Sequence, residues 1–352
     1  MKPYRQTMPF VRLMALGATL GCCVPFPLRA QTAAPAPGYQ PQQFVAGTLR
    51  IWGHDYLSAV TQYWAEGFQR FHPGVRFEIN LMGSATAIPG LYAGRADLAF
   101  LGRENNITDN NGFMRPLTYK PERFELTTGS LDAPGKAGAI VIFVHRDNPL
   151  TQLTLKQLDA IFGYERRRGA PSPIQTWDQM GLTGEWAGRP INLYTYDAET
   201  GTGLYFLHAV LGDSRKMNWE RLKEFKDIKN SDGSVYRSAQ QSLDALQEDR
   251  HGMAAASLRF ATAKVKALAL AGQDGSPYYQ ATRENLIARA YPLTRLTYAF
   301  INRPPGTAMD PKVKEFLRYI FSAEGQQDIL RDRNGYLPLK PETLAAQRGL
   351  LE

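Results

Sequence analysis

Between residues 48 and 103, segments with the apolar spacing of a strand alternate with segments that have the apolar spacing of a helix. Val75, Phe77 and Ile79 alternate with polar residues, which predicts a strand, whereas Val60 and Trp64 repeat with helical spacing. The expected elements are strands at 48–52, 75–81 and 97–103, with one helix in each gap. Strand, helix, strand, helix, strand is typical of a parallel sheet with helices on its faces. The pattern therefore predicts an α/β fold.

The same alternation continues in the rest of the chain. Thr154 stands where a helix prefers a capping hydroxyl, and Pro311 where a helix tolerates a proline in its first turn. Further strands are expected at 139–144, 190–196 and 296–301, with helices at 155–162, 204–211 and from Pro311 onwards. A body of roughly 300 residues can bury a sizeable core, most readily as two domains.

Polar residues stand just beyond three of the early elements. Asp55 follows the first strand, Ser84 follows the second and Arg103 ends the third. In sheets of this kind ligands bind beyond the carboxyl ends of the strands. The three residues are therefore candidates for a binding site.

The segment from Tyr194 to Phe206 gives the clearest chemical signal. An apolar strand is followed by Thr200-Gly201-Thr202-Gly203 and then by helical spacing. The first turn of such a helix has unpaired N–H groups and a partial charge of about half a unit. Glycines let a bound group approach closely, and hydroxyls add donors, so the segment suits an oxyanion. The alternative is an ordinary N-capped helix after a glycine turn.

The first thirty residues have the pattern of a secretory signal. Basic residues precede an apolar run at 13–23 that is too short to span a bilayer, and a cleavage site is expected near Ala30. Cys22 and Cys23 leave lipid attachment open, although the residues before them match a lipoprotein cleavage box poorly. Residues 31–46, rich in Ala, Pro and Gln, are expected to form a flexible tether.

Composition narrows the function further. Both cysteines lie in the signal segment, so the mature chain has no disulfide and no thiolate metal site. Its 37 basic and 33 acidic residues give a mild positive charge, which favours small anions and makes no case for nucleic acid. The five histidines show no metal-ligand spacing, so neither a metal nor a cofactor is expected.

Several separated motifs resemble one family, the periplasmic phosphate-binding proteins of ABC importers. Thr200-Gly201-Thr202 is similar to the family's Ser-Gly-Thr anion loop, and Tyr291-Pro292-Leu293-Thr294-Arg295 to its Tyr-Pro-Leu-Ser-Arg segment. The other matching pieces are Gly83-Ser84, Ala96-Asp97, Asn148-Pro149, Leu153 to Gly163, Trp177 and Gly335 to Leu339. Together these pieces cover nearly all of residues 48–339 in the family's order.

The resemblance implies a two-lobed periplasmic-binding-protein fold of type II. Each lobe would be a mainly parallel sheet flanked by helices, and two crossing strands, near 139–144 and 296–301, would join them. The expected divisions are 1–30 signal peptide, 31–46 tether, 47–141 and 299–345 first lobe, 142–298 second lobe, and 346–352 tail. The implied partners are inorganic phosphate or a similar anion and an inner-membrane ABC permease. A monomer is expected.

The chain departs from the family at several site positions. The family has a Thr in the first strand-to-helix loop and an Arg four residues before the anion loop, where this chain has Asp55 and Tyr196. The family's Asp or Ser after the third strand corresponds to Gly102, with Arg103 beside it. Only Ser84 and the Thr-Gly-Thr loop carry over cleanly. The candidate ligand-binding residues are Ser84, Thr200, Gly201, Thr202, Asp55, Tyr56, Arg103 and Tyr196.

Each departing residue has a functional and a structural interpretation. Arg103 either replaces the missing arginine or forms a salt bridge at the surface or between the lobes. Asp55 either accepts a proton from phosphate, and so rejects sulfate, or caps the following helix. Tyr56 and Tyr196 either offer hydroxyls or pack.

Three functions follow from these observations. The leading hypothesis is an extracytoplasmic solute-binding protein that captures phosphate or a related oxyanion for an ABC importer. The second keeps the fold as a sensor, a surface or secreted binding protein, or a binder of a different ligand. A secreted phosphatase is the third, although the chain has no G-x-S-x-G or H-E-x-x-H motif and no obvious nucleophile–base pair, so no catalytic residue is assigned.

Overall fold

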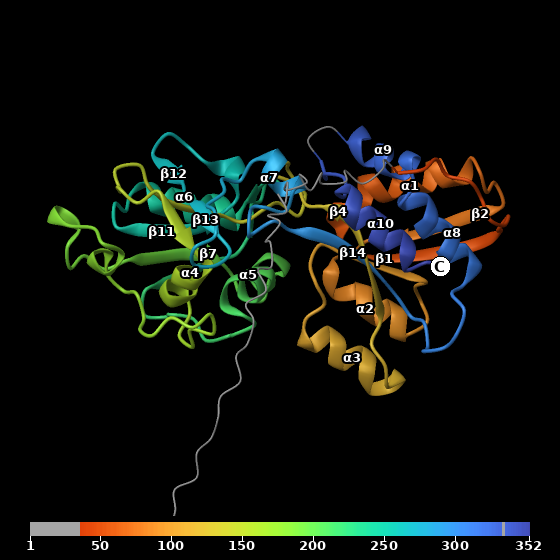
Figure 1. Cartoon of the computed structure of the whole chain (residues 1–352), viewed down its shortest axis with the longest axis horizontal. Coiled ribbons are helices and arrows are strands. Elements are labelled where there is room, and N and C mark those ends of the chain that lie inside the picture. Colours follow the sequence, from red (N-terminus) through yellow and green to blue (C-terminus); the bar gives the residue numbers. More distant parts are fainter. Residues whose placement is uncertain (1–35, 333–334) are drawn as a thin grey trace, which may run out of the picture. The chain divides into compact units, whose positions relative to one another are not determined.

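The strands predicted near the start of the chain lie side by side in one five-stranded sheet (Figure 1). The computed structural model describes residues 36–332 and 335–352. The sheet has the order β2-β1-β3-β14-β4, with bounds Val75–Asn80, Gly47–Gly53, Leu98–Leu101, Leu296–Ile301 and Glu122–Thr128. Four strands point in one direction and β14 runs against them, which confirms the mainly parallel sheet.

Helices cover both faces of this first sheet, because its strands alternate their buried side chains. Leu98 and Phe100 of β3 pack in one core, while Ala99 and Leu101 pack in another on the opposite face. Around the first core lie α1 (Ser58–Gln69), α8 (Pro311–Ile320), α9 (Ala323–Arg331) and α10 (Pro341–Gly349); around the second lie α2 (Ser84–Tyr92) and α3 (Ile107–Leu117). We call this sheet and its helices the first lobe.

A second five-stranded sheet forms the middle of the chain. Its order is β12-β5-β11-β7-β8, with bounds Val265–Ala267, Val141–His145, Gly252–Ala256, Asn192–Tyr196 and Leu222–Phe225. Again four strands share one direction, and β5 opposes them. Its helices are α4 (Leu155–Phe162), α5 (Gly201–Leu211), α6 (Ser238–Gln247) and α7 (Arg283–Ile287). This sheet and its helices are the second lobe.

Short elements complete the second lobe and the loops. Two-stranded sheets pair β6 (Gln152–Thr154) with β13 (Ala269–Ala271), and β9 (Ile228–Lys229) with β10 (Val235–Tyr236). Single 3-10 turns are η1 (Asp55–Leu57), η2 (Trp177–Met180), η3 (Gly184–Trp186) and η4 (Leu258–Phe260). The helix starts that the sequence indicated are confirmed at Thr154, whose hydroxyl accepts from the N–H of Gln157, and at Pro311. Among the described residues no helix is both long and apolar enough to cross a bilayer.

The connections between the sheets differ slightly from the expectation. β5 lies wholly in the second sheet and β14 wholly in the first, so the crossings are the segments just before them, at 129–140 and 288–295. These segments run beside one another: the N–H of Gly129 donates to the carbonyl of Arg295 at 2.7 Å, and the N–H of Ile140 to that of Leu293 at 3.3 Å. The two crossings are therefore mutually supported.

The segment expected to be a tether is packed where it is described. Tyr39 is buried, and its hydroxyl lies 2.6 Å from Oε2 of Glu315 and 2.7 Å from Nε2 of His72. The prediction of a free tether is wrong for this part: Tyr39 packs on Phe68 of α1 and Tyr319 of α8, and an Ala/Pro/Gln-rich sequence gave no sign of this packing. The expected signal peptide, cysteines and cleavage site lie outside the described residues. The tail at 346–352 includes the last turn of α10, with Leu351 buried.

Candidate functional site

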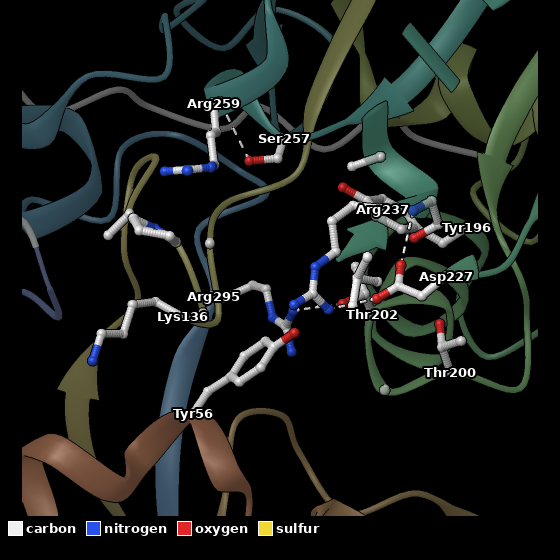
Figure 2. Close-up of a pocket in the computed structure, with 18 of the residues that line it drawn as sticks. Tyr56, Lys136, Tyr196, Thr200, Thr202, Asp227, Arg237, Ser257, Arg259 and Arg295 are labelled. Carbon is white, nitrogen blue, oxygen red and sulfur yellow. Dashed lines mark hydrogen bonds and ion pairs between the residues drawn. The ribbon is translucent and has the colours of Figure 1, made fainter. Parts of the chain in front are cut away.

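A cavity of about 550 Å³ is lined by residues of both lobes and of the connecting segments. The first lobe contributes His54, Asp55, Tyr56 and Ser84. The second lobe contributes Tyr196, Thr200 to Thr202, Asp227, the start of α6 and the loop around Arg259, while Lys136 and Arg295 come from the crossings (Figure 2). Seven of the eight candidate residues line this one cavity.

The start of α5 leaves two amides free at the cavity. Thr200 is the N-cap, and its hydroxyl accepts from the N–H of Gly203 at 3.0 Å and donates to the carbonyl of Asp197 at 2.8 Å. No acceptor is found in the described part of the chain for the N–H groups of Gly201 and Thr202. The helix therefore begins with donors available to a ligand. The Thr200 hydroxyl, in contrast, already uses its proton, so only the Thr202 hydroxyl is free to donate.

Position 203 requires glycine because the backbone of Asp197 lies very close to it. A Cβ at this position would lie 2.0 Å from the carbonyl oxygen of Asp197, whereas a Cβ at Gly201 would meet nothing within 4 Å. The two glycines thus have different roles. Gly203 closes the turn before the helix, and Gly201 keeps the cavity side of its amide open.

Two further helices start at the same cavity. Ser84 is the first residue of α2, after Gly83 in a left-handed conformation (φ 117°). Ser238, Ala239 and Gln240 form the first turn of α6. The partial positive charges of three helix starts therefore meet in one cavity, which favours an anion over a cation.

Arg295 is the buried cation of the site. Its side chain bonds the hydroxyl oxygen of Thr202 at 3.0 Å and the carbonyl of Gly102 at 2.6 Å, and its guanidinium lies over the ring of Tyr205. Burial lowers the pKa of Arg295, partly offset by neighbouring tyrosines and Glu104, yet an arginine stays protonated at neutral pH. The side chain links the exit of β3 in the first lobe to the start of α5 in the second.

The remaining cations of the cavity differ in how they are paired. Arg237 donates to Oδ2 of Asp227 at 2.7 Å, and Lys136 forms an ion pair with Asp332 that turns its amine away from Arg295 (Figure 2). Arg259 lines the cavity, is exposed, and makes no ion pair with a described residue. The charged lining residues are thus four cations and two carboxylates, Asp55 and Asp227.

Asp55 lines the cavity and contacts His54. Its Oδ1 lies 3.1 Å from Nδ1 of His54, and this contact is the main cause that lowers the pKa of Asp55. The alternative in which Asp55 caps the following helix is not seen, because neither η1 nor α1 has a side-chain cap. Burial lowers the pKa of His54 in turn, so the ring tends to be neutral and the carboxylate charged.

The ring of His54 also occupies the place of a missing side chain. A Cβ at Gly102 would lie 2.5 Å from Cδ2 of His54 and 3.2 Å from Cβ of Ala137. Gly102 is the position at which the family that this chain resembles has an acidic or hydroxyl side chain. The cavity therefore has Asp55 as the one carboxylate that the first lobe supplies to its described lining.

Arg103 does not line the cavity. Its Nη1 forms an ion pair with Asp109 at 2.6 Å and donates to the carbonyl of Glu104, and the side chain is buried. The prediction that Arg103 replaces the missing arginine is contradicted by this placement. Arg103 instead forms a salt bridge, as in the alternative interpretation. Its partner Asp109 lies in the first turn of α3, so the bridge stays within the first lobe.

Tyr56 and Tyr196 both present a phenol to the cavity. Tyr196 is buried, and burial raises the pKa of both hydroxyls, so each stays protonated and can donate. Both residues line the cavity, and neither hydroxyl has a hydrogen-bond partner among the described residues. Packing and donation are therefore compatible at both positions.

Sequence reasoning missed Arg295, Arg237 and Asp227. Arg295 stood in a motif used only to recognise the family, although an arginine at the start of a buried strand is itself a signal. Arg237 precedes the Ser that opens α6, in a polar stretch with weak periodicity, and Asp227 lies ten residues before it. Nothing in the sequence indicates that Arg237 and Asp227 form an ion pair. No cluster of three metal-ligating side chains occurs in the ranges that the structure describes.

Two helix-flanked sheets joined by paired crossings, with a cavity lined by three helix starts from both lobes, define a two-lobed solute-binding fold. A family model described as a PBP superfamily domain matches residues 38–324. The chain belongs to this superfamily.

Among its relatives is the phosphate-binding protein PstS of Pseudomonas aeruginosa, 34% identical over 305 residues, which are 86% of this chain and 86% of that protein. Protein SphX of Synechococcus elongatus is 21% identical over 84% of this chain and 79% of its own length.

Solved structures share the fold. PstS from Borrelia burgdorferi has a TM-score of 0.55 at 18% identity, over 83% of this chain and 99% of that one. An ABC-type phosphate transport receptor from Vibrio cholerae has a TM-score of 0.52 at 19% identity, over 82% and 99%.

Proposed function

We propose that this protein is an extracytoplasmic solute-binding protein that captures phosphate or a related oxyanion between its lobes and delivers it to an ABC permease in the inner membrane. Removal of the signal segment near Ala30 would place it outside the cytoplasm, where it acts as a monomer. It binds its ligand without converting it.

The observation that carries this proposal is the start of α5. The amides of Gly201 and Thr202 have no acceptor in the described chain, and they face the cavity that Arg295 and the starts of α2 and α6 also line. Oriented N–H groups and a nearby guanidinium are the groups that hold oxyanions in proteins. Relatives named as phosphate-binding proteins make phosphate the first ligand to test.

Binding would bring donors of both lobes onto one ligand. Ser84 and Tyr56 approach from the first lobe, and the α5 amides with the Thr202 hydroxyl from the second. A ligand contacted from both sides stabilises the arrangement in which the lobes close over it. The closed arrangement is then the form that the permease recognises.

Asp55 supplies selectivity in this proposal. It is ionised at neutral pH, so it accepts a hydrogen bond from a protonated phosphate oxygen and repels an oxyanion that has no proton. Asp55→Asn should therefore narrow the difference in affinity between phosphate and sulfate, measured by titration calorimetry with both anions. An unchanged ratio of the two dissociation constants would exclude this role.

The primary test is titration calorimetry of the mature protein with phosphate, sulfate, molybdate and small carboxylates. We expect heat and saturation with phosphate at one site per chain. Absence of heat with all of these anions would refute the proposal.

One observation favours a second candidate ligand, a phosphate monoester. The cavity of about 550 Å³ lies in the range of about 300–1,000 Å³ that suits larger molecules, and Arg259 is exposed at its rim. Glycerol phosphate in the same titration separates the candidates. Tighter binding of the ester than of inorganic phosphate would favour the second.

A further inference from the structure

Arg237 occupies a distinctive place in the cavity. It is the residue just before α6, and Ser238 to Gln240 of that helix line the cavity with it. Tyr196, where the family resemblance predicts an arginine, brings no charge to the same lobe. A cation for the ligand must therefore come from elsewhere in the lining.

Arg295 adds positive charge to the cavity, but both of its terminal nitrogens already donate to the protein. One of its terminal nitrogens donates to Gly102 and the other to Thr202, and its Nε is buried without a partner among the described residues. Turning toward a ligand would require the side chain to give up bonds that it already makes. Its role is to hold the Thr202 hydroxyl oxygen, which leaves the proton of that hydroxyl free.

Arg237 has the opposite arrangement. Asp227 binds one terminal nitrogen at 2.7 Å, and no other contact of the guanidinium is found in the described chain. Because a guanidinium carries five N–H donors in a rigid fork, its remaining edge is available. The side chain is 43% exposed, so a ligand can reach it.

The carboxylate of Asp227 is oriented toward the protein. Its Oδ1 accepts from the N–H of Ser238 at 2.8 Å, and its Oδ2 accepts from Arg237. Burial opposes ionisation of Asp227, but these hydrogen bonds outweigh it and lower its pKa. Asp227 therefore stays charged and fixes the direction of the guanidinium relative to the start of α6.

Groups of the first lobe face the same guanidinium. Tyr56 and Asp55 of the first lobe line the same cavity as Arg237 and Arg295. Figure 2 shows the side chains of Arg237, Arg295 and Tyr56 directed into one space beside Thr202.

We propose that Arg237, held in place by Asp227, is the arginine that neutralises the bound oxyanion, in place of the arginine expected at Tyr196. The inference rests on the proposed function, since it assigns a binding residue for that ligand. The ligand class it selects is a tetrahedral oxyanion with two adjacent oxygens, which a forked guanidinium pairs with well.

The test compares four variants with the wild-type protein by titration calorimetry with inorganic phosphate. Arg237→Ala should bind phosphate about 10- to 100-fold more weakly, because one charge-assisted contact is lost. Arg237→Lys should recover part of the loss, since it keeps a charge but not the fork. Asp227→Asn should bind more weakly than wild type through a less fixed guanidinium. Arg250→Ala is the matched control, an arginine of the same lobe in an exposed ion pair away from the cavity.

A second readout separates binding from folding. The dissociation constant of Arg237→Ala should depend less steeply on ionic strength than that of the wild type, because one of the charges that attract the ligand is gone. Its Tm without phosphate should stay close to the wild-type Tm, since an exposed pair adds little stability.

Phosphate binding by Arg237→Ala within about twofold of wild type, with an unchanged salt dependence, would overturn this inference and leave the proposed function standing. Absence of phosphate binding by the wild-type protein would overturn both. Should the alanine variant misfold, the lysine variant decides, and wild-type affinity in that variant would refute the requirement for a fork.

Discussion

A single added methyl group has opposite consequences at Gly201 and Gly203. At Gly203 it would meet the carbonyl oxygen of Asp197 at 2.0 Å, a backbone atom that cannot move aside cheaply. At Gly201 it would point into open space beside an amide that the proposed ligand needs. The pair therefore separates the structural from the functional use of glycine in this loop.

We predict that Gly203→Ala lowers the free energy of unfolding by about 1–3 kcal/mol, as overpacked substitutions do. Gly201→Ala should keep the wild-type Tm or raise it slightly, since alanine suits a helix better, yet bind phosphate more weakly. Thermal unfolding with and without phosphate measures both effects. Equal affinity of Gly201→Ala and wild type would show that no ligand approaches this amide.

His54 makes stability depend on pH. Its pKa in the folded protein is lowered by burial, so the unfolded chain binds more protons wherever the pH lies between this pKa and about 6.5. The free energy of unfolding must then fall as the pH drops below about 6.5. We expect His54→Asn to reduce this fall in urea titrations between pH 8 and pH 5. An identical pH profile of variant and wild type would contradict the assignment.

At the scale of elements, apolar spacing predicted the helices and strands with continuous buried faces. It missed β4, whose sequence Glu122 to Thr128 alternates charges with Phe124 and Leu126. Glu122 and Glu125 are paired with Arg303 and Arg289, at 2.6 Å each. Partners more than 160 residues away make these acids tolerable in a strand, and a local pattern cannot reveal them.

The residues of the candidate site also fall into those that the sequence predicted and those that it did not. Ser84 and the Thr-Gly-Thr loop were predictable, because a hydroxyl and glycines at a helix start have a local reason to be there. Arg295 and Arg237 were not, because their importance depends on which helix starts the fold brings together. The prediction that Arg103 binds the ligand was wrong for the same reason. Its partner Asp109 lies in α3, a helix that the spacing of apolar residues had not indicated.

A buried hydrogen-bonded group, together with backbone hydrogen bonds, holds the N-terminal segment to the first lobe. Tyr39 joins Glu315 and His72, both about 1% exposed. We predict that Tyr39→Phe lowers the free energy of unfolding by about 1–3 kcal/mol, because buried polar atoms lose a partner. Urea unfolding measures the change. Tyr164→Phe, at an exposed tyrosine, is the control and should stay within about 0.5 kcal/mol.

At the scale of the whole molecule, Arg295 joins groups that belong to different lobes. It bonds the carbonyl of Gly102 and the hydroxyl of Thr202 from the end of a crossing segment. Occupation of the α5 start is thereby connected to the region where the chain passes between its sheets.

We therefore expect phosphate to slow amide hydrogen exchange in both lobes at once, in the first turns of α2, α5 and α6. The reason is that ligand contacts from both sides reduce local opening. Hydrogen-exchange mass spectrometry with and without phosphate checks this, with α10 as the internal reference that should not change. Slowing confined to α5 would argue against a ligand shared by the lobes.

The ring of His54 beside Gly102 also limits the routes by which this binding site can evolve. A Cβ at position 102 would lie 2.5 Å from Cδ2 of His54, so a larger residue there requires the imidazole to shift or position 54 to become smaller. Substitutions at positions 54 and 102 are therefore expected to be coupled and not independent in their effect on the free energy of unfolding.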